Sequence, residues 1–444
     1  MPVPAPRRTG SDFAPYIWAT PLEEVARRHG LSPSHVLRFD SNLPAFPAPL
    51  PPGARAALSE RADYPEGTYR ELREAAAAYA GCDSDEIAID AGADGLIGLV
   101  ARTFLSAGRH AVVEEPTYPV YAIASRIEGA EVLVAPRDLG ALAEAARDAH
   151  VLWICNPGNP NGELFGAADV AKVADALPQT VVCVDEAYFE YAGETTASHA
   201  RERPNLVCVR TLSKAFGLAG LRVGYAISSR STASELTNRR APGPISNFAA
   251  ALGAGVLRHP SFAEAEAEAV RAERERFRGA FLAAGWDAPE SHASFVVVRT
   301  PEGPALAAEL ESRGLVVRSY PDALRISVRS PSDDDLVLTA LGIDPPVASR
   351  RSATVLGVAV RVSLVLDGTG RVSSRTGDDD EDRRIEEHAS ARGWDLEVVA
   401  DAAARRDAVD GALAEAETRA GSYRAPSQPR PLGPTLPPDP RPRR

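Results

Sequence analysis

The stretch RTLSKAFGLAGLRVGY, residues 210–225, places a lysine in glycine-rich, mostly apolar surroundings. Lys214 within it is one of only two lysines in a chain of 444 residues that carries 49 basic side chains. Burial among apolar groups lowers the pKa of a lysine, and the free amine then attacks carbonyl groups. After it, Gly217 and Gly220 let the backbone turn closely round a ligand, and the Arg222 guanidinium can pair with a phosphate. The stretch predicts a carbonyl-binding lysine beside an anion site.

Polar residues that suit such a site follow apolar runs elsewhere in the chain. Asp185 ends the run VVCVD, and Tyr188 lies three residues further on. Asn159 follows the run VLWIC, and Tyr118 follows HAVVEE. Ligands of open α/β sheets bind at the carboxyl ends of the strands, so these side chains are candidates for one site. The segment AGADGLIGL, residues 91–99, begins a predicted helix whose free N–H groups could seat a phosphate.

Short β-branched runs alternate with helical patterns between residues 83 and 228, which predicts an α/β fold with a mostly parallel sheet. The expected strands are 110–115, 131–136, 150–156, 181–186, 205–211 and 222–228. Helices are expected at 69–81 and 261–285, each ended by a glycine. Residues 294–341 predict a smaller α+β part with strands at 294–299, 314–320 and 323–328 and helices at 304–314 and 333–342.

Composition excludes several classes of function. A net charge of −12 argues against nucleic acid as a partner, because phosphate binding favours a basic surface. The sequence has no run of 18 apolar residues, so no membrane span is expected. The N-terminus lacks the apolar core of a secretory signal. The four cysteines are widely spaced, which predicts reduced thiols, no metal site and a cytoplasmic protein.

Together these motifs resemble the fold type I pyridoxal-phosphate enzymes, and specifically the histidinol-phosphate aminotransferase branch. The matching segments occur in the family's order between residues 11 and 342: YPEGTYRELREAAAAYAG, AGADGLI, EEPTYPVY, NPGNPNG, VDEAYFEY, TLSKAFGLAGLRVGY and ALRISV. The resemblance implies pyridoxal 5'-phosphate as the cofactor. It also implies amino acid and 2-oxo acid substrates, and a homodimer with composite active sites.

The resemblance also implies a role for individual residues. Lys214 would bind the cofactor as an internal aldimine and move the proton at the substrate Cα, and Asp185 would pair with the pyridine nitrogen. Other cofactor contacts would come from residues at the ring and the phosphate: Tyr118, Asn159, Tyr188, Ala93, Asp94, Thr211, Ser213, Arg222 and, from the partner subunit, the counterpart of Tyr64. The substrate would be held by Arg325, Tyr16 and Asn159.

Three features depart from the family pattern. Asn161 stands where threonine is usual, and residues 239–250 lack an expected aromatic residue. Arg329 stands where glycine is usual and resembles the threonine-phosphate decarboxylase branch, so a second substrate-binding arginine is expected there. Transamination between an amino acid or amino-alcohol phosphate and a 2-oxo acid is the favoured reaction. The alternative is decarboxylation of a phosphorylated amino acid or another pyridoxal-phosphate reaction in a specialised pathway.

A second resemblance lies in the C-terminal part. The segments RRSATVLGVAVRVSLVLDGTGRVSSRTG and GWDLEVVAD are similar to the first half of imidazoleglycerol-phosphate dehydratase, and a hairpin is expected around DGTG. His388 is the only histidine after His292, so the metal-binding histidines of that family are missing. We expect a degenerate, non-catalytic unit.

These patterns predict six divisions of the chain. They are an N-terminal arm (1–35), a large cofactor-binding domain (36–235), a small domain (236–342), a linker (343–350), the dehydratase-like α+β unit (351–420) and a disordered, basic, proline-rich tail (421–444).

Overall fold

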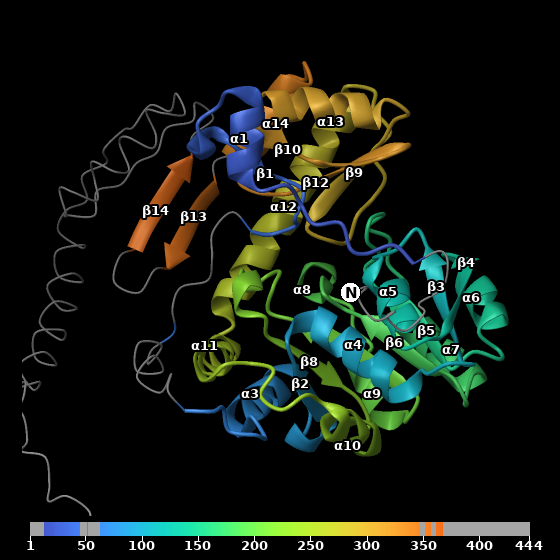
Figure 1. Cartoon of the computed structure of the whole chain (residues 1–444). Helices are drawn as coiled ribbons and strands as arrows, with labels where there is room; N and C mark the ends of the chain where they lie inside the picture. Colours follow the sequence, from blue (N-terminus) through green and yellow to red (C-terminus); the bar gives the residue numbers. More distant parts are fainter. Residues whose placement is uncertain (1–12, 45–50, 52–62, 347–350, 357–360, 367–444) are drawn as a thin grey trace, which may run out of the picture. The chain divides into compact units, whose positions relative to one another are not determined.

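The computed structural model describes residues 13–44, 51, 63–346, 351–356 and 361–366 (Figure 1). The chain forms two compact units, Met1–Ala353 and Thr354–Arg444. Across the described residues, no helix has the length and apolar character needed to cross a membrane.

A seven-stranded sheet forms the centre of the first unit, with the strand order β2-β8-β7-β6-β5-β3-β4. The strands are β2 (Ile87–Asp90), β3 (His110–Glu115), β4 (Glu131–Pro136), β5 (Val151–Cys155), β6 (Val181–Asp185), β7 (Leu206–Thr211) and β8 (Gly224–Ile227). The run from β4 to β7 is parallel, whereas β8 is antiparallel to both of its neighbours. The predicted α/β fold with a mostly parallel sheet is confirmed.

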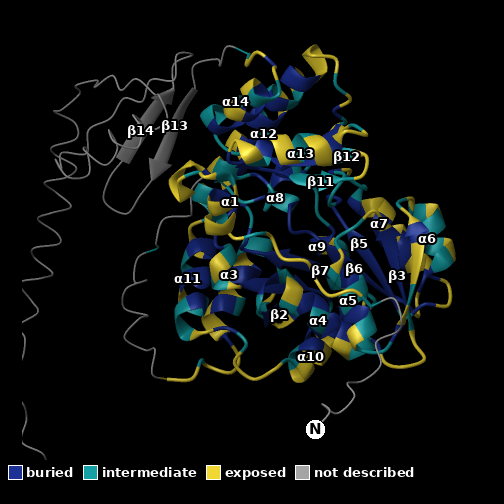
Figure 2. Ribbon diagram, turned by 45° about the horizontal axis from the view of Figure 1, so that its top comes forward, coloured by how far each residue is buried: buried dark blue, intermediate teal, exposed yellow. Residues whose placement is uncertain are grey.

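Alternation along the strands divides the core into two layers, because successive side chains point to opposite faces of a sheet. In β5, Leu152 and Ile154 join one apolar cluster, while Val151 and Trp153 join the other. The helices over the sheet are α4 (Gly92–Phe104), α5 (Val120–Ile127) and α10 (Arg230–Arg239) on the face of Trp153, with α3 (Arg70–Ala80), α6 (Leu139–Ala145), α7 (Ala167–Ala176) and α9 (Ala197–Glu202) contributing to the other cluster. Figure 2 shows the strands buried between helices whose outer faces are exposed.

A smaller sheet of order β11-β12-β9 follows in the chain. Its strands are β9 (Phe295–Arg299), β11 (Arg318–Tyr320) and β12 (Ala323–Ser327), and its helices are α12 (Ser261–Ala283), α13 (Gly303–Ser312) and α14 (Pro331–Ala340). The N-terminal segment joins this part through the parallel pair β1 (Leu37–Arg38) and β10 (Leu315–Val316). The remaining elements are α1 (Leu22–His29), α8 (Phe189–Ala192), α11 (Asn247–Arg258) and the 3-10 helices η1 (Pro33–His35), η3 (Ser84–Glu86) and η4 (Ala219–Leu221).

The expected elements are confirmed to within two residues, with one exception. The single strand expected at 314–320 is two strands, β10 and β11, which pair with different neighbours, β1 and β12. Elements that were not predicted individually include β2, a short strand at the edge of the central sheet, β1, and the helices α1, α5, α6, α7, α9, α10 and α11.

Two strands are described at the start of the C-terminal part. They are β13 (Arg351–Leu356) and β14 (Arg361–Leu366), which pair with each other. Both precede the DGTG segment at 367–370, so the turn expected there lies outside the described residues, as do the rest of the dehydratase-like unit and the tail.

Candidate active site

The predicted site residues meet at the carboxyl ends of neighbouring parallel strands. Asp185 is the last residue of β6 and Thr211 the last residue of β7. Lys214 comes three residues after β7, and Asn159 four residues after β5. The strand order β7-β6-β5 places these three loops side by side.

Lys214 is the central amine of the site. Its Nζ donates a hydrogen bond to the backbone oxygen of Ser41, over 3.0 Å, and lies 5.6 Å from the centre of the Tyr188 ring. Burial, together with the positive charge of Arg325, lowers the pKa of Lys214 to about 8. At neutral pH the amine therefore needs far less free energy to lose its proton than an exposed lysine does.

Asp185 is a buried carboxylate with one donor on each oxygen. The Tyr121 hydroxyl donates to Oδ2 over 2.7 Å, and the Ala187 N–H donates to Oδ1 over 3.1 Å. Desolvation raises the pKa of Asp185 to about 6. Tyr121 itself stacks on Trp153 with ring centres 5.6 Å apart, so the carboxylate is held by a rigid partner. Tyr121, the second tyrosine of EEPTYPVY, was not among the predicted site residues.

Beside these groups lies a region suited to an anion. The α4 helix begins at Gly92, and none of the described side chains caps its N-terminus. A Cβ on Gly92 would lie 2.9 Å from Nη2 of Arg222, so the guanidinium packs against that helix end. Nη2 also donates to Asp94 over 2.8 Å, and Asp94 accepts the Tyr118 hydroxyl over 3.0 Å.

Two hydroxyls complete that region. Thr211 donates from Oγ1 to the Ser213 hydroxyl over 2.8 Å, and both residues are buried. Thr211 ends β7, and Ser213 directly precedes Lys214. Ala93 lies in the first turn of α4, where its N–H belongs to the free end of the helix.

Arg325 enters the site from β12. Its Nη1 donates to Oδ1 of Asn159 over 2.5 Å, and its Nη2 donates to the Asp40 carbonyl over 2.6 Å. Its Nε is buried and has no hydrogen-bond partner among the described residues. Because a buried guanidinium N–H costs free energy when unpaired, this atom is suited to receive an anionic group.

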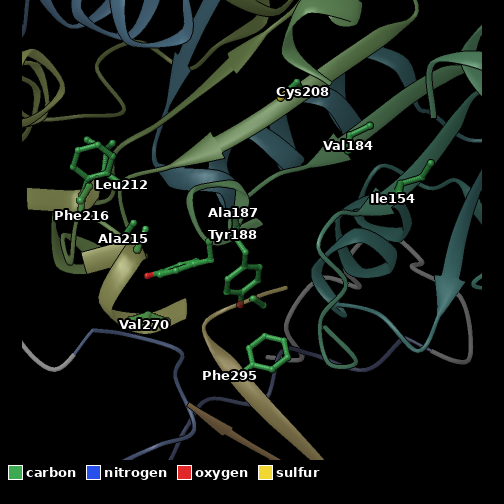
Figure 3. Close-up of a cluster of buried hydrophobic side chains, with 14 of the residues drawn as sticks. Ile154, Val184, Ala187, Tyr188, Cys208, Leu212, Ala215, Phe216, Val270 and Phe295 are labelled. Carbon is green, nitrogen blue, oxygen red and sulfur yellow. The ribbon is translucent and has the colours of Figure 1, made fainter. Parts of the chain in front are cut away.

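Tyr188 lies under the site and packs against the smaller sheet. Its hydroxyl accepts a hydrogen bond from Nδ2 of Asn42 over 2.9 Å, and its ring meets the Phe295 ring edge-on at 5.6 Å. Figure 3 shows Tyr188 pointing toward Phe295 within the apolar cluster. Burial raises the pKa of Tyr188 above its ordinary value, so the phenol stays protonated. Asn42, which has a positive φ of 54°, was also missed.

The other predicted residues lie at the periphery. Tyr16 is exposed and its ring lies 6.2 Å from that of Tyr118. Tyr64 is 97% exposed in this chain. The Arg329 guanidinium donates to Asp333 over 3.1 Å, and its substrate role stays a prediction.

This set of groups fits pyridoxal phosphate. Lys214 offers an amine for the aldehyde, Asp185 offers a carboxylate for a protonated ring nitrogen, and the α4 end with Arg222 suits the phosphate. The unpaired Nε of Arg325 leaves a donor for an acidic substrate. In the described residues no group of three or more His, Cys, Asp or Glu side chains could hold a metal ion.

Comparison with known proteins gives the same result. Residues 34–341 match the model of the family "Aminotransferase class I and II". A histidinol-phosphate aminotransferase of Symbiobacterium thermophilum is 34% identical over 343 residues, which cover 74% of this chain and 95% of that protein. Histidinol-phosphate aminotransferase 2 of Methylococcus capsulatus is 35% identical, with the same shares covered.

Solved structures resemble the fold. Histidinol-phosphate aminotransferase from Sinorhizobium meliloti, solved in complex with pyridoxal 5'-phosphate, matches with a TM-score of 0.67 and 27% identity, over 75% of this chain and 97% of that chain. L-threonine-O-3-phosphate decarboxylase from Porphyromonas gingivalis matches with a TM-score of 0.61 and 22% identity, over 69% and 98%, which shows a common fold only.

The two lysines should titrate differently in the cofactor-free protein. Only the free amine reacts with acetic anhydride, so labelling of Lys214 should rise with a midpoint at about pH 8. Lys172 is exposed, and its hydrogen bond to Asp169 raises its pKa above the ordinary value, so it should label at higher pH. Mass spectrometry of the two peptides across a pH series measures both curves. Labelling curves with the same midpoint for both lysines would contradict the lowered pKa of Lys214.

Proposed function

The chain belongs to the aminotransferase class I and II family, and from that premise we propose that it is a pyridoxal-phosphate-dependent aminotransferase of the histidinol-phosphate aminotransferase type. The observation that carries the proposal is the buried Lys214 amine, whose pKa is lowered to about 8 by burial and by the charge of Arg325, and which also interacts electrostatically with the Asp185 carboxylate. It would transfer an amino group between an amino acid or amino-alcohol phosphate and a 2-oxo acid.

When bound, pyridoxal phosphate supplies an aldehyde that condenses with amines and a pyridinium ring that withdraws electrons from the substrate Cα. Lys214 would attach the cofactor and, once displaced by substrate, would take the proton from Cα and return it at the next step. Asp185, held by Tyr121 and the Ala187 N–H, would keep the ring nitrogen protonated. Tyr188 and Asn159 would donate to the phenolic oxygen of the cofactor, and Tyr118 would stack on its ring.

The phosphate would lie at the free end of α4. The N–H groups of Ala93 and Asp94, the hydroxyls of Thr211 and Ser213, and the Arg222 guanidinium would bind it. The contact between Arg222 and Asp94 supports this assignment, because it already holds the guanidinium against the first turn of the helix.

The substrate would bind through its acidic group. Arg325 would receive a carboxylate or phosphate at its unpaired Nε, and Tyr16 would close over the substrate from the N-terminal arm. Lys214 comes from the proposed large domain (36–235) and Arg325 from the proposed small domain (236–342), so movement of these parts would bring both to the substrate. Arg329 would need to leave Asp333 to take part.

A homodimer would complete each site with a tyrosine from the other subunit. Tyr64 is 97% exposed, yet its segment is held by contacts of Asn247 with Asp63 and of Arg240 with Gly67. An aromatic side chain that is exposed on an anchored segment is suited to an interface.

We place the enzyme in the cytoplasm, since all four cysteines are free thiols.

The C-terminal unit would take no part in catalysis. The family match ends at residue 341, and the first compact unit ends at Ala353. We propose that the C-terminal unit descends from a dehydratase-like domain. This proposal rests on the segments RRSATVLGVAVRVSLVLDGTGRVSSRTG and GWDLEVVAD.

Transamination predicts a spectral change that names the substrate. Protein loaded with pyridoxal phosphate should show a visible band, and glutamate or histidinol phosphate should convert the cofactor to the pyridoxamine form. Lys214→Ala should abolish the visible band, whereas the matched variant Lys172→Ala should keep it, because Lys172 is exposed. A band that no amino acid shifts would instead support decarboxylation, and a normal band in Lys214→Ala would contradict the assignment of the lysine.

The composite site predicts complementation between two defective variants. Tyr64→Ala should bind the cofactor about tenfold more weakly, since a hydrogen bond to a charged group is lost. A mixed dimer of Tyr64→Ala and Lys214→Ala subunits holds one intact site, so refolding the two in equal amounts should restore about a quarter of the wild-type activity. Activity no higher than the sum of the separate variants would contradict the shared site.

A shortened chain that ends at Pro346 should keep full activity. The end point retains Ile343, which is buried in the apolar core. Turnover and cofactor affinity should lie within about twofold of the full chain, because the site residues all lie between Tyr16 and Arg329. Loss of activity with normal folding, measured by circular dichroism, would mean that the C-terminal unit contributes to the site.

A further inference from the structure

A buried ion pair lies beside the site and has no assigned role. Arg137 follows directly on β4, and Glu114 lies near the carboxyl end of β3. Nη1 of Arg137 donates to Oε2 of Glu114 over 2.5 Å, and the two side chains are only 3% and 0% exposed. A buried ion pair stabilises a fold little beyond what apolar residues would, because both charges lose their water. The hydrogen bonds that the pair makes to the neighbouring loop point instead to a role in orientation.

The Arg137 guanidinium binds both ends of the loop that carries Asn159. Nη1 donates to the carbonyl of Cys155 over 2.9 Å, and Nη2 donates to the carbonyl of Glu163 over 2.8 Å. The planar face of the guanidinium lies 4.2 Å from the centre of the Phe165 ring. One rigid fork therefore fixes the two residues that frame the segment 156–162.

The loop is closely packed against the Arg137 guanidinium at Gly158. A Cβ on Gly158 would lie 2.9 Å from Cζ of Arg137 and would also collide with Oδ1 of Asn161. Gly158 donates from its backbone to the same Glu163 carbonyl that Arg137 binds, over 2.8 Å. The loop backbone therefore rests directly on Arg137.

Glu114 extends the same control to the neighbouring loop. Its Oε1 accepts the backbone N–H of Cys155 over 2.8 Å and the Thr117 hydroxyl over 3.3 Å. Tyr118, the proposed ring-stacking residue, follows Thr117 directly. The pair thus connects β3, β4 and β5 at the edge of the sheet where the site lies.

Asn159 connects the loop to Arg325, the proposed substrate-binding arginine. Its Oδ1 accepts the bond from Nη1 of Arg325, while the Asp40 carbonyl accepts the other terminal nitrogen. The orientation in which Nε of Arg325 stays free for an anion therefore depends on where the loop holds Asn159.

We propose that Arg137, paired with Glu114, is a positioning residue that sets the Asn159 loop and, through Asn159, aims Arg325 at the acidic group of the substrate. The proposal rests on the proposed function, in which Arg325 binds that group.

A double-mutant cycle on ligand binding tests it. Glutarate carries two carboxylates but neither an amine nor a ketone, so its binding to the cofactor-loaded enzyme can be measured by calorimetry without turnover. Arg325→Met and Arg137→Met should each weaken glutarate binding about tenfold or more, since each removes or misplaces a charge-assisted contact. The double variant should be no weaker than Arg325→Met alone, because both changes act through one contact.

Two further variants separate positioning from charge and from general stability. Arg137→Lys keeps a positive charge beside Glu114 but cannot hold both carbonyls, so glutarate binding should remain weak. Arg276→Met breaks a comparable partly buried cluster, in which Arg276 donates to Glu273, Asp335 and the Pro331 carbonyl, and should leave glutarate binding unchanged. If Arg137→Met does not fold, Arg137→Gln replaces it in the same cycle.

Different results would contradict the positioning role of Arg137 and the substrate-binding role of Arg325. Additive losses in the cycle, full binding in Arg137→Met or full rescue by Arg137→Lys would each overturn the positioning role. Normal glutarate binding by Arg325→Met would overturn the role of Arg325 in the proposed function, and this inference with it. That failure is recognised separately, because it appears in a variant that leaves Arg137 intact.

Discussion

Burial of β5, β6 and β7 on both faces is the constraint on which the site depends. Strands that lie between two helix layers must carry apolar side chains along their length, as Leu152 and Trp153 do on opposite faces of β5. Polar groups can then enter only where the strands end. Asp185 and Thr211 occupy those positions, and the parallel register brings them to the same edge of the sheet. The apolar layers therefore concentrate the chemistry in one place.

The same burial adjusts the two reactive groups in opposite directions. Desolvation disfavours charge, so it raises the pKa of Asp185 to about 6 and lowers that of Lys214 to about 8. Each value moves toward neutrality, where proton transfer is most effective. Asp94 and Asp185 act against the shift of Lys214, whereas Arg325 and Arg222 act with it, so cofactor and substrate anions would change this balance when they bind.

Site residues could be predicted from the sequence where a neighbouring apolar run shows that they lie at the end of a strand. Lys214 and Asp185 follow apolar strands, and the seven ordered motifs gave the fold and cofactor. Asn42, Tyr121 and Arg137 could not be found, because their importance comes from contacts with Tyr188, Asp185 and Cys155, which lie far away in the chain. The division of 314–320 into two strands likewise follows from pairing with β1, a partner nearly 280 residues distant. Long-range pairing of this kind leaves no local pattern.

The scarcity of lysine in this chain sets position 214 apart from other basic positions. Arginine supplies 47 of the 49 basic side chains, and at surface positions that need only a positive charge the exchange of lysine for arginine costs little stability. At position 214 the exchange is chemically forbidden, because a guanidinium stays protonated and cannot condense with an aldehyde. Lys214 is therefore restricted to lysine by the chemistry proposed for it, whereas the exposed Lys172 is under no such restriction, in a chain whose other 47 basic side chains are all arginine.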